Sequence, residues 1–200
     1  MIERAAILLA KKGLQGTSFS EVLEASGAPR GSLYYHFPGG KEELVLAALT
    51  ATCERALTLL DEIRGQPAAE VARKFVGLWR SVLERSDFSA GCAVAAVAVA
   101  ADSQALQEGV AAVFRAWRSR LADVLAEGGI PPDRAPAIAT TLVSAIEGAV
   151  IIARAERSFE PFDTMAAEQI AAIAAAIQSA SESNRGDRAS QRRVVPRTRR

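Results

Sequence analysis

Apolar residues that recur at three- and four-residue steps are the feature that most constrains how this chain can fold. In residues 41–64 the spacing persists for about six helical turns, at Val45, Ala48, Leu49, Thr52, Ala56, Leu59, Leu60 and Ile63. Residues at this period share one face of an α-helix, whereas a half-buried strand needs strict alternation. Half of the residues are hydrophobic, and the β-branched ones are scattered instead of clustered in short runs. The sequence therefore predicts an all-α protein.

Clusters of glycine and proline mark where the helices end. Gly13 and Gly16 follow the first helix, and Ser18 with Glu21 forms the capping box expected at the start of the second. A turn at Gly27 precedes a third helix that Pro29 can begin. The expected helices cover residues 2–12, 19–25, 29–37, 41–63, 68–85, 92–101, 104–127, 133–158 and 163–183.

The arrangement of these helices predicts two domains and a tail. Residues 1–47 form a three-helix head with the start of a connecting helix, and residues 48–183 form a helical body. Residues 184–200 are rich in Arg, Ser and Gln, with few large apolar residues, and are expected to be disordered. Residues 185–200 hold seven arginines against one aspartate, while the rest of the chain is mildly acidic. Such a tail either adds non-specific phosphate affinity or is a solvated end, and both interpretations stay open.

Several classes of protein do not fit these residues. Cys53 and Cys92 have neither a paired nor a metal-ligand spacing, and one histidine is present, so we expect no disulfide framework, no zinc site and no cofactor. The first residues lack the features of a signal peptide, and the longest uninterrupted apolar run, residues 92–101, is too short to span a bilayer. We therefore expect a cytoplasmic protein without a membrane partner.

An enzyme would need a nucleophile with a base, a pair of carboxylates or a metal. The single histidine, His36, lies in the third helix, and no glycine-rich phosphate loop or metal motif is present. We therefore expect no catalytic residues.

The second and third helices, joined by a turn that contains Gly27, have the layout of a helix-turn-helix motif. Its small core is expected to consist of Leu9, Leu14, Phe19, Val22, Leu23, Leu33 and Phe37. The opposite face of the third helix would then present Arg30, Gly31 and Ser32 to a major groove. Arginine can donate paired hydrogen bonds to guanine or phosphate, and glycine allows a close approach to the bases.

Residues 17–49, TSFSEVLEASGAPRGSLYYHFPGGKEELVLAAL, resemble the DNA-binding head of the TetR family. The shared pattern is a capped helix, an Ala-x-Gly turn, Gly-Ser-hydrophobe-Tyr-x-His-Phe and Lys-Glu-x-Leu. The resemblance implies a homodimer with paired recognition helices on double-stranded palindromic operator DNA, and an effector pocket in the body. The DNA contacts that it implies are Thr17, Ser18, Arg30, Gly31, Ser32, Tyr34, Tyr35, His36 and Lys41.

Two departures from the common pattern narrow the resemblance. Pro29 stands where a hydroxyl residue is usual, so one phosphate contact is in doubt. The segment Phe-Pro-Gly-Gly that separates the third helix from Lys41 is one residue longer than usual. Together with residues 88–92, it is similar to the LmrA/YxaF-type subgroup. This implies a repressor of efflux or detoxification genes, released by a small hydrophobic or aromatic effector. The alternative is a DNA-binding regulator or architectural protein without an effector.

The body supplies the expected dimer surface and ligand site. Dimerisation is expected through helices near 133–158 and 163–183, on stripes that consist of Ile138, Leu142, Ala145, Ile146, Ala149, Val150 and Ala153, and of Ala166, Ile170, Ile173, Ala174 and Ile177. Either stripe could instead face the protomer's own core. The ligand candidates are Phe75, Trp79, Cys92, Phe114, Trp117, Arg118 and Glu147, with Arg154 as a further polar anchor. Their alternative is ordinary core packing.

Overall fold

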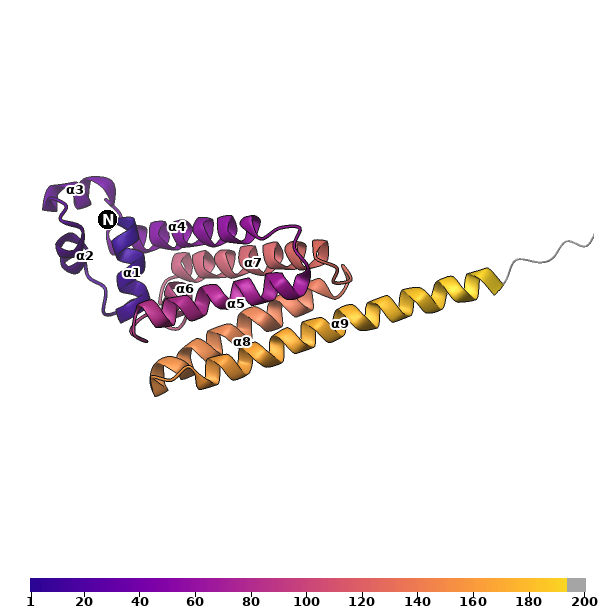
Figure 1. Cartoon of the computed structure of the whole chain (residues 1–200). Helices are drawn as coiled ribbons and strands as arrows, with labels where there is room; N and C mark the ends of the chain where they lie inside the picture. The colour runs from indigo at the N-terminus through magenta and orange to yellow at the C-terminus, as the bar shows by residue number, and fades with distance from the viewer. Residues whose placement is uncertain (194–200) are drawn as a thin grey trace, which may run out of the picture.

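The computed structural model describes residues 1–193, except the side chains of Leu33 and residues 180–193. Within these residues the structure consists of helices joined by turns, which confirms the predicted all-α fold (Figure 1). The helices are α1 (Ile2–Lys12), α2 (Phe19–Ser26), α3 (Arg30–His36), α4 (Lys41–Glu62), α5 (Ala68–Arg85), α6 (Ala93–Ala98), α7 (Gln104–Glu127), α8 (Ala135–Glu156) and α9 (Glu160–Arg193).

The end of α9 corrects one expectation. Residues 184–193, which the composition marked as disordered, continue the helix to Arg193. Arginine, glutamine and alanine, which make up six of these ten residues, are good helix formers, and no proline occurs in this stretch to stop them. Figure 1 shows α9 leaving the body at the end opposite the head. The rest of the predicted tail lies outside the described residues.

Helices α1 to α3 form the head, and local sequence signals fix its turns. The Oγ of Ser18 accepts a hydrogen bond from the backbone N–H of Glu21, whose carboxylate accepts one from the N–H of Ser18, so the predicted capping box is confirmed. Lys12 and Ser18 donate to the Glu21 carboxylate and lower its pKa to about 2. Gly27 ends α2 in the left-handed region, with φ 67°, and its N–H donates to the carbonyl of Leu23.

Helices α4 to α9 form a layered bundle behind the head (Figure 1). Helix α4 packs on α7, α7 on α8, and α8 on α9, while α5 contacts α7, α8 and α9. The short α6 lies between α1 and α7, and the N–H of Gly91, just before α6, donates to the carbonyl of Ala10 in α1. The head is therefore connected to the body through α4 and through the start of α6.

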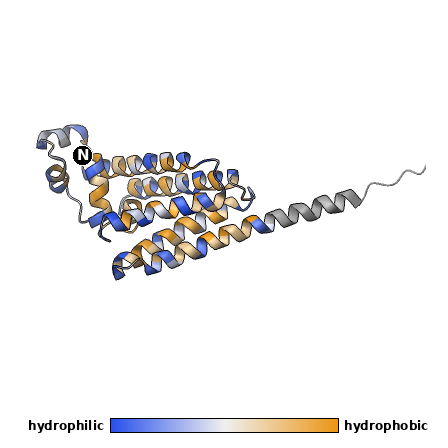
Figure 2. Ribbon diagram, in the orientation of Figure 1, coloured by the Kyte–Doolittle hydropathy of each residue, from blue (hydrophilic) through white to orange (hydrophobic). Residues whose placement is uncertain are grey.

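Two apolar clusters hold the described helices together. The first joins α5, α7, α8 and α9 and includes Leu83, Leu125 and Phe162. The second runs from the head into the body, from Leu9 and Val22 to residues of α4, α6 and α7. Figure 2 shows the corresponding apolar residues along the bundle and in α1, and more hydrophilic residues at α3. The second cluster therefore packs the head directly against α4 and α6.

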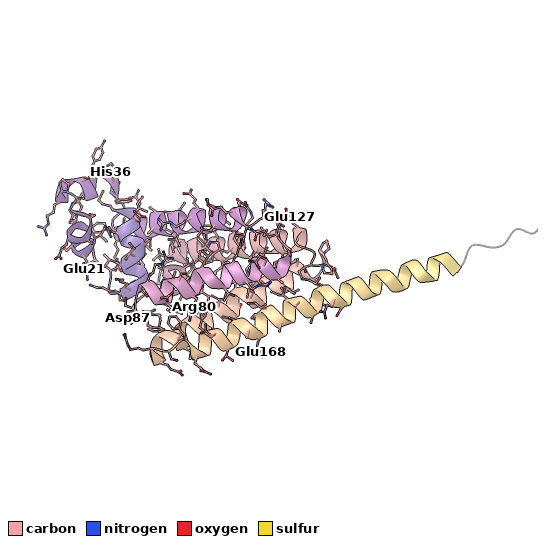
Figure 3. The ribbon with its side chains drawn as sticks, in the orientation of Figure 1. Glu21, His36, Arg80, Asp87, Glu127 and Glu168 are labelled. Carbon is pink, nitrogen blue, oxygen red and sulfur yellow. The ribbon has the colours of Figure 1, made fainter. Side chains whose placement is uncertain are left out.

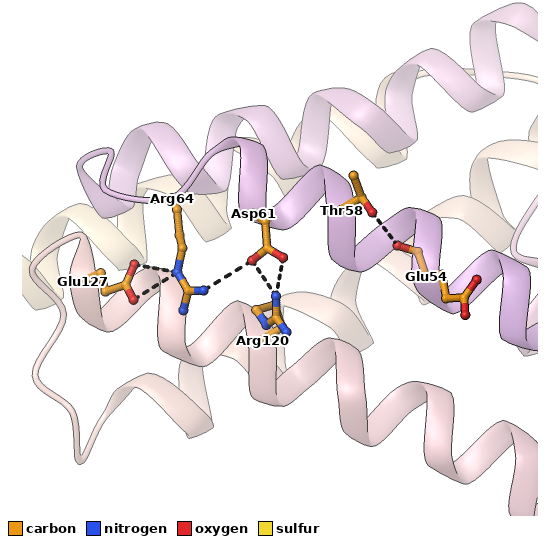
Figure 4. Close-up of polar contacts among 6 residues, drawn as sticks. All are labelled: Glu54, Thr58, Asp61, Arg64, Arg120 and Glu127. Atoms are coloured by element: carbon orange, nitrogen blue, oxygen red, sulfur yellow. Dashed lines mark hydrogen bonds and ion pairs between the residues drawn. The ribbon is translucent and has the colours of Figure 1, made fainter.

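The end of α4 that lies far from the head is tied to α7 by ion pairs (Figure 4). The Nε of Arg64 lies 3.0 Å from a carboxylate oxygen of Glu127. The Nη1 of Arg64 lies 3.4 Å from a carboxylate oxygen of Asp61. Asp61 also accepts a hydrogen bond from Arg120 of α7. These pairs fix the distal end of α4 against the bundle.

Helix α8 is long and apolar enough to cross a bilayer, judged by its 22 residues and composition alone. One face of it, which includes Leu142, Ile146 and Val150, is buried among α5, α7 and α9. A core helix of a bundle satisfies the same test of length and apolarity. Its place in the bundle therefore explains the apolar residues of the buried face of α8, while Ile151 and Ile152 stay exposed.

Candidate DNA interface and ligand cavity

The outer face of α3 presents side chains to solvent. Arg30 is exposed and makes no hydrogen bond or ion pair to the described part of the chain. A Cβ added to Gly31 would meet nothing within 4 Å, so this glycine serves no packing purpose in the isolated protomer. Ser32 is half-buried beside them. The uncovered backbone of Gly31 allows close approach to base edges in a major groove, and the neighbouring guanidinium and hydroxyl can form hydrogen bonds with them.

Two tyrosines continue this face. Tyr35 is 81% exposed and packs edge-on against His36, with ring centroids 5.2 Å apart. Tyr34 is 66% exposed and makes a similar contact with Phe19 of α2, at 5.9 Å. Figure 3 labels His36 at the outer end of the head. Both phenols are free to donate to phosphate oxygens while their rings are held by neighbours.

Three other predicted DNA contacts have roles within the head. Thr17 is only 2% exposed, and its hydroxyl donates to the carbonyl of Gly13 at 2.8 Å. The side chain of Ser18 caps α2. Lys41 donates from Nζ to the carbonyl of Leu14 at 2.6 Å, which ties the start of α4 to the turn that follows α1. An ammonium has three donors, so Lys41 keeps two for a phosphate, whereas the Thr17 hydroxyl is removed from the surface.

The body contains an apolar cavity of about 180 Å³ between α4, α5 and α7. Three of the predicted ligand residues line it, namely Phe75, Trp79 and Trp117. Helix α4 contributes Thr52, Arg55 and Leu59, which the sequence reasoning did not select. The recurring apolar face of residues 41–64 was a signal for Thr52 and Leu59, since it extends well beyond what packing against the head requires, whereas nothing in the spacing pointed to Arg55.

The remaining ligand candidates do not line this cavity. Phe114 packs edge-on against Trp117, with centroids 5.8 Å apart, and Arg118 of α7 donates to Thr140 of α8 at 3.4 Å. Arg154 donates to the backbone carbonyls of Phe88 and Ser89 and so holds the loop before α6.

Cys92 and Glu147 instead form a buried pair between the start of α6 and α8. Burial raises the pKa of Glu147 to about 7, although a hydrogen bond from the Cys92 thiol opposes that rise. Burial also raises the pKa of Cys92, and the neighbouring carboxylate adds to the effect. The Oε1 atom of Glu147 is shielded from solvent without a hydrogen-bond partner among the described residues. Both groups are therefore favoured in their protonated forms.

The stripes selected for dimerisation face mostly inward. On α8, Leu142, Ile146, Ala149, Val150 and Ala153 are buried within the protomer, and on α9 so is Ile173. Helix α8 is apolar around most of its circumference, so its periodicity could not identify the outer face. That face exposes Ser144, Gly148, Ile151, Ile152 and Ala155, with Ile151 59% exposed. On α9 the exposed alanines with described side chains are Ala167, Ala171, Ala172 and Ala175.

Both the head and the body of the chain match families of known proteins. Residues 1–48 match the model of bacterial regulatory proteins of the tetR family, and residues 68–168 match that of the LmrA/YxaF-like transcriptional regulator C-terminal domain. The chain is 37% identical to an uncharacterized HTH-type transcriptional regulator of Mycobacterium tuberculosis, over 82% of this chain and 87% of that protein. It is 27% identical to the HTH-type transcriptional regulator LmrA of Bacillus subtilis, over 80% and 88%.

A solved structure shares the fold. The regulatory protein TetR from Rhodobacter sphaeroides superposes with a TM-score of 0.75 at 24% identity, over 84% of this chain and 95% of that one. The matched families cover the helix-turn-helix head and most of the body. The chain therefore belongs to the TetR family of DNA-binding transcriptional regulators and carries a C-terminal domain of the LmrA/YxaF-like type.

Proposed function

We propose that the protein is a homodimeric, ligand-responsive repressor that binds palindromic operator DNA through α3. The observation that supports this most is the outer face of α3, where the side chains of Arg30 and Tyr35 are exposed and the backbone of Gly31 is uncovered. Arg30, Gly31 and Ser32 contact bases in this proposal, while Tyr34, Tyr35, His36 and Lys41 contact the backbone. Thr17 contributes through its main chain, because its hydroxyl is buried.

The exposed faces of α8 and α9 form the dimer surface in this proposal. Ile151 and Ile152 lie among small residues on α8, and exposed alanines recur every fourth residue on α9. Small residues allow helices to approach closely, and two helices from each protomer give a four-helix contact. Such a dimer holds two recognition helices at the separation of successive major grooves, about 34 Å.

The cavity between α4, α5 and α7 is the proposed effector site. Its lining is mostly apolar, which suits a small hydrophobic or aromatic effector. Helix α4 lines the cavity and also packs against α1, so one helix contacts both the effector and the head. An effector that favours a displaced α4 would respace the two heads and release the operator.

The genes under control are proposed to be those of efflux or detoxification, as the LmrA/YxaF-type resemblance implies, and the protein is proposed to act in the cytoplasm. Repression follows if the bound dimer blocks polymerase at the operator.

A gel-shift series tests the assignment of α3. Arg30→Ala and Tyr35→Ala are expected to weaken operator binding about five-fold or more, since each removes base or phosphate contacts worth about 1–3 kcal/mol. Arg73→Ala, on the outer side of α5, is the matched control and should bind as the wild type does. Wild-type affinity in both α3 variants would show that another surface reads the DNA. If no aromatic compound in a screen alters the operator affinity, the alternative of a DNA-binding regulator without an effector is favoured.

A further inference from the structure

The lining of the cavity is almost entirely apolar, and Arg55 is the charged residue that contributes to it. Thr52 also lines the cavity, and its hydroxyl donates to the carbonyl of Ala48 at 2.7 Å. Among the described residues, no carboxylate belongs to the lining. An acidic ligand therefore meets a cationic partner in Arg55 and no carboxylate of the described lining that would repel it.

The volume of the cavity limits the size of its occupant. An apolar cavity of about 150 Å³ accommodates benzene, so about 180 Å³ suits a single aromatic ring with a small substituent. The rings of Phe75, Trp79 and Trp117 line the same space. Aromatic rings pack favourably in edge-on or offset arrangements, which adds to the gain from burial.

Arg55 has a partner outside the cavity. Its Nη2 lies 2.9 Å from an oxygen of Glu3, which belongs to α1 of the head. The two side chains are 63% and 69% exposed, so water weakens this ion pair and its rupture is easy. A carboxylate at the mouth of the cavity would compete with Glu3 for the same guanidinium.

We propose that the cavity binds a small aromatic acid, whose carboxylate takes Arg55 from Glu3 and thereby loosens the head from α4. The proposal rests on the proposed function, in which this cavity is the effector site. A ligand shifts a conformational equilibrium only when it binds the two states unequally. Here the inequality arises because Arg55 is occupied by Glu3 in one state and is available in the other.

Tryptophan fluorescence measures binding directly, because both tryptophans of the chain line the cavity. The probes are benzoate, benzyl alcohol and benzylamine at pH 7, which share a ring and differ in charge. Benzoate is expected to bind about ten-fold more tightly than benzylamine, as a charge-assisted hydrogen bond allows. Arg55→Gln should remove this preference, while Arg73→Gln should keep it. Far-ultraviolet circular dichroism confirms that each full-length variant is folded.

Operator binding tests the coupling to the head. Benzoate should weaken operator binding by the wild type. Glu3→Gln should bind benzoate about two- to five-fold more tightly, because the competitor of the carboxylate is gone. Its operator affinity should respond less to benzoate than that of the wild type.

The outcomes separate the two proposals. Equal affinity for the three probes overturns the acid proposal while the cavity remains the effector site. An undiminished benzoate response in Glu3→Gln overturns the competition for Arg55. The absence of both fluorescence change and operator response with all three probes removes the cavity as the effector site and the acid proposal with it.

Discussion

Replacing Glu147 with glutamine should change how the stability of the protein depends on pH. The carboxyl group lies between α8 and the start of α6, and its burial raises its pKa from 4.5 to about 7. Folding therefore favours the protonated, neutral acid. Glutamine has the same shape and stays neutral, so it reproduces the protonated form at every pH.

The sign and size follow from the difference in pKa between the unfolded and folded chains. Between pH 4.5 and about 7 the folded state binds more protons than the unfolded state, so the free energy of unfolding falls as pH rises through this range. The full loss is about 3 kcal/mol, at 1.4 kcal/mol for each unit of pKa. It is absent below pH 4.5 and complete above about pH 7. Water that reaches the partly exposed side chain reduces this figure.

Urea unfolding at one fixed protein concentration, at pH 4 and at pH 8.5, measures the effect. Glu147→Gln should match the wild type at pH 4 and exceed its free energy of unfolding by about 1–3 kcal/mol at pH 8.5, an estimate of order of magnitude. Glu156→Gln, an exposed glutamate on the same helix, is the control and should match the wild type at both values. If Glu147→Gln and the wild type differ equally at the two pH values, the carboxyl group is not held in its neutral form.

Three further substitutions test the head and the dimer surface. Gly31→Val should fold normally, because a Cβ there meets nothing within 4 Å, yet lose operator binding; retained binding would refute close approach of α3 to the bases. Ile151→Glu should convert the dimer to monomers in sedimentation at micromolar concentration, since it places a charge on the outer face of α8; an unchanged sedimentation coefficient of dimer size would place the interface elsewhere. Ser18→Ala should lower the free energy of unfolding by about 1 kcal/mol through the lost cap, measured by urea denaturation, and no change would mean that the capping box adds nothing.

Features encoded by neighbouring residues could be predicted from the sequence. The capping box of Ser18 and Glu21 and the stop at Gly27 depend on contacts within a few residues, so their spacing is diagnostic. The exposed face of α3 could be predicted because the buried positions Val22 and Phe37 set its orientation. Glycine and proline marked most helix ends in the same way, but α6 ends earlier than expected, at Ala98, and α9 begins earlier, at Glu160.

Features set by distant contacts could not be predicted. Nothing in the spacing reveals that Lys41 reaches the carbonyl of Leu14, or that Arg55 pairs with Glu3. An apolar periodicity shows that α8 has a buried face, but α8 is apolar on most sides, so the face toward a partner stayed undetermined. The continuation of α9 to Arg193 was missed because a polar composition suits an exposed helix as well as a disordered chain.

Selection of bound sequences from a random pool of double-stranded DNA tests the central claim, that paired α3 helices on a dimer read an operator. The account predicts one palindrome whose half-sites are centred about one helical turn apart, as two major-groove readers require. Arg30→Ala should relax the preference at symmetric positions in both halves, while Arg73→Ala recovers the wild-type palindrome. An asymmetric site, or a palindrome that Arg30→Ala recovers unchanged, would contradict the account.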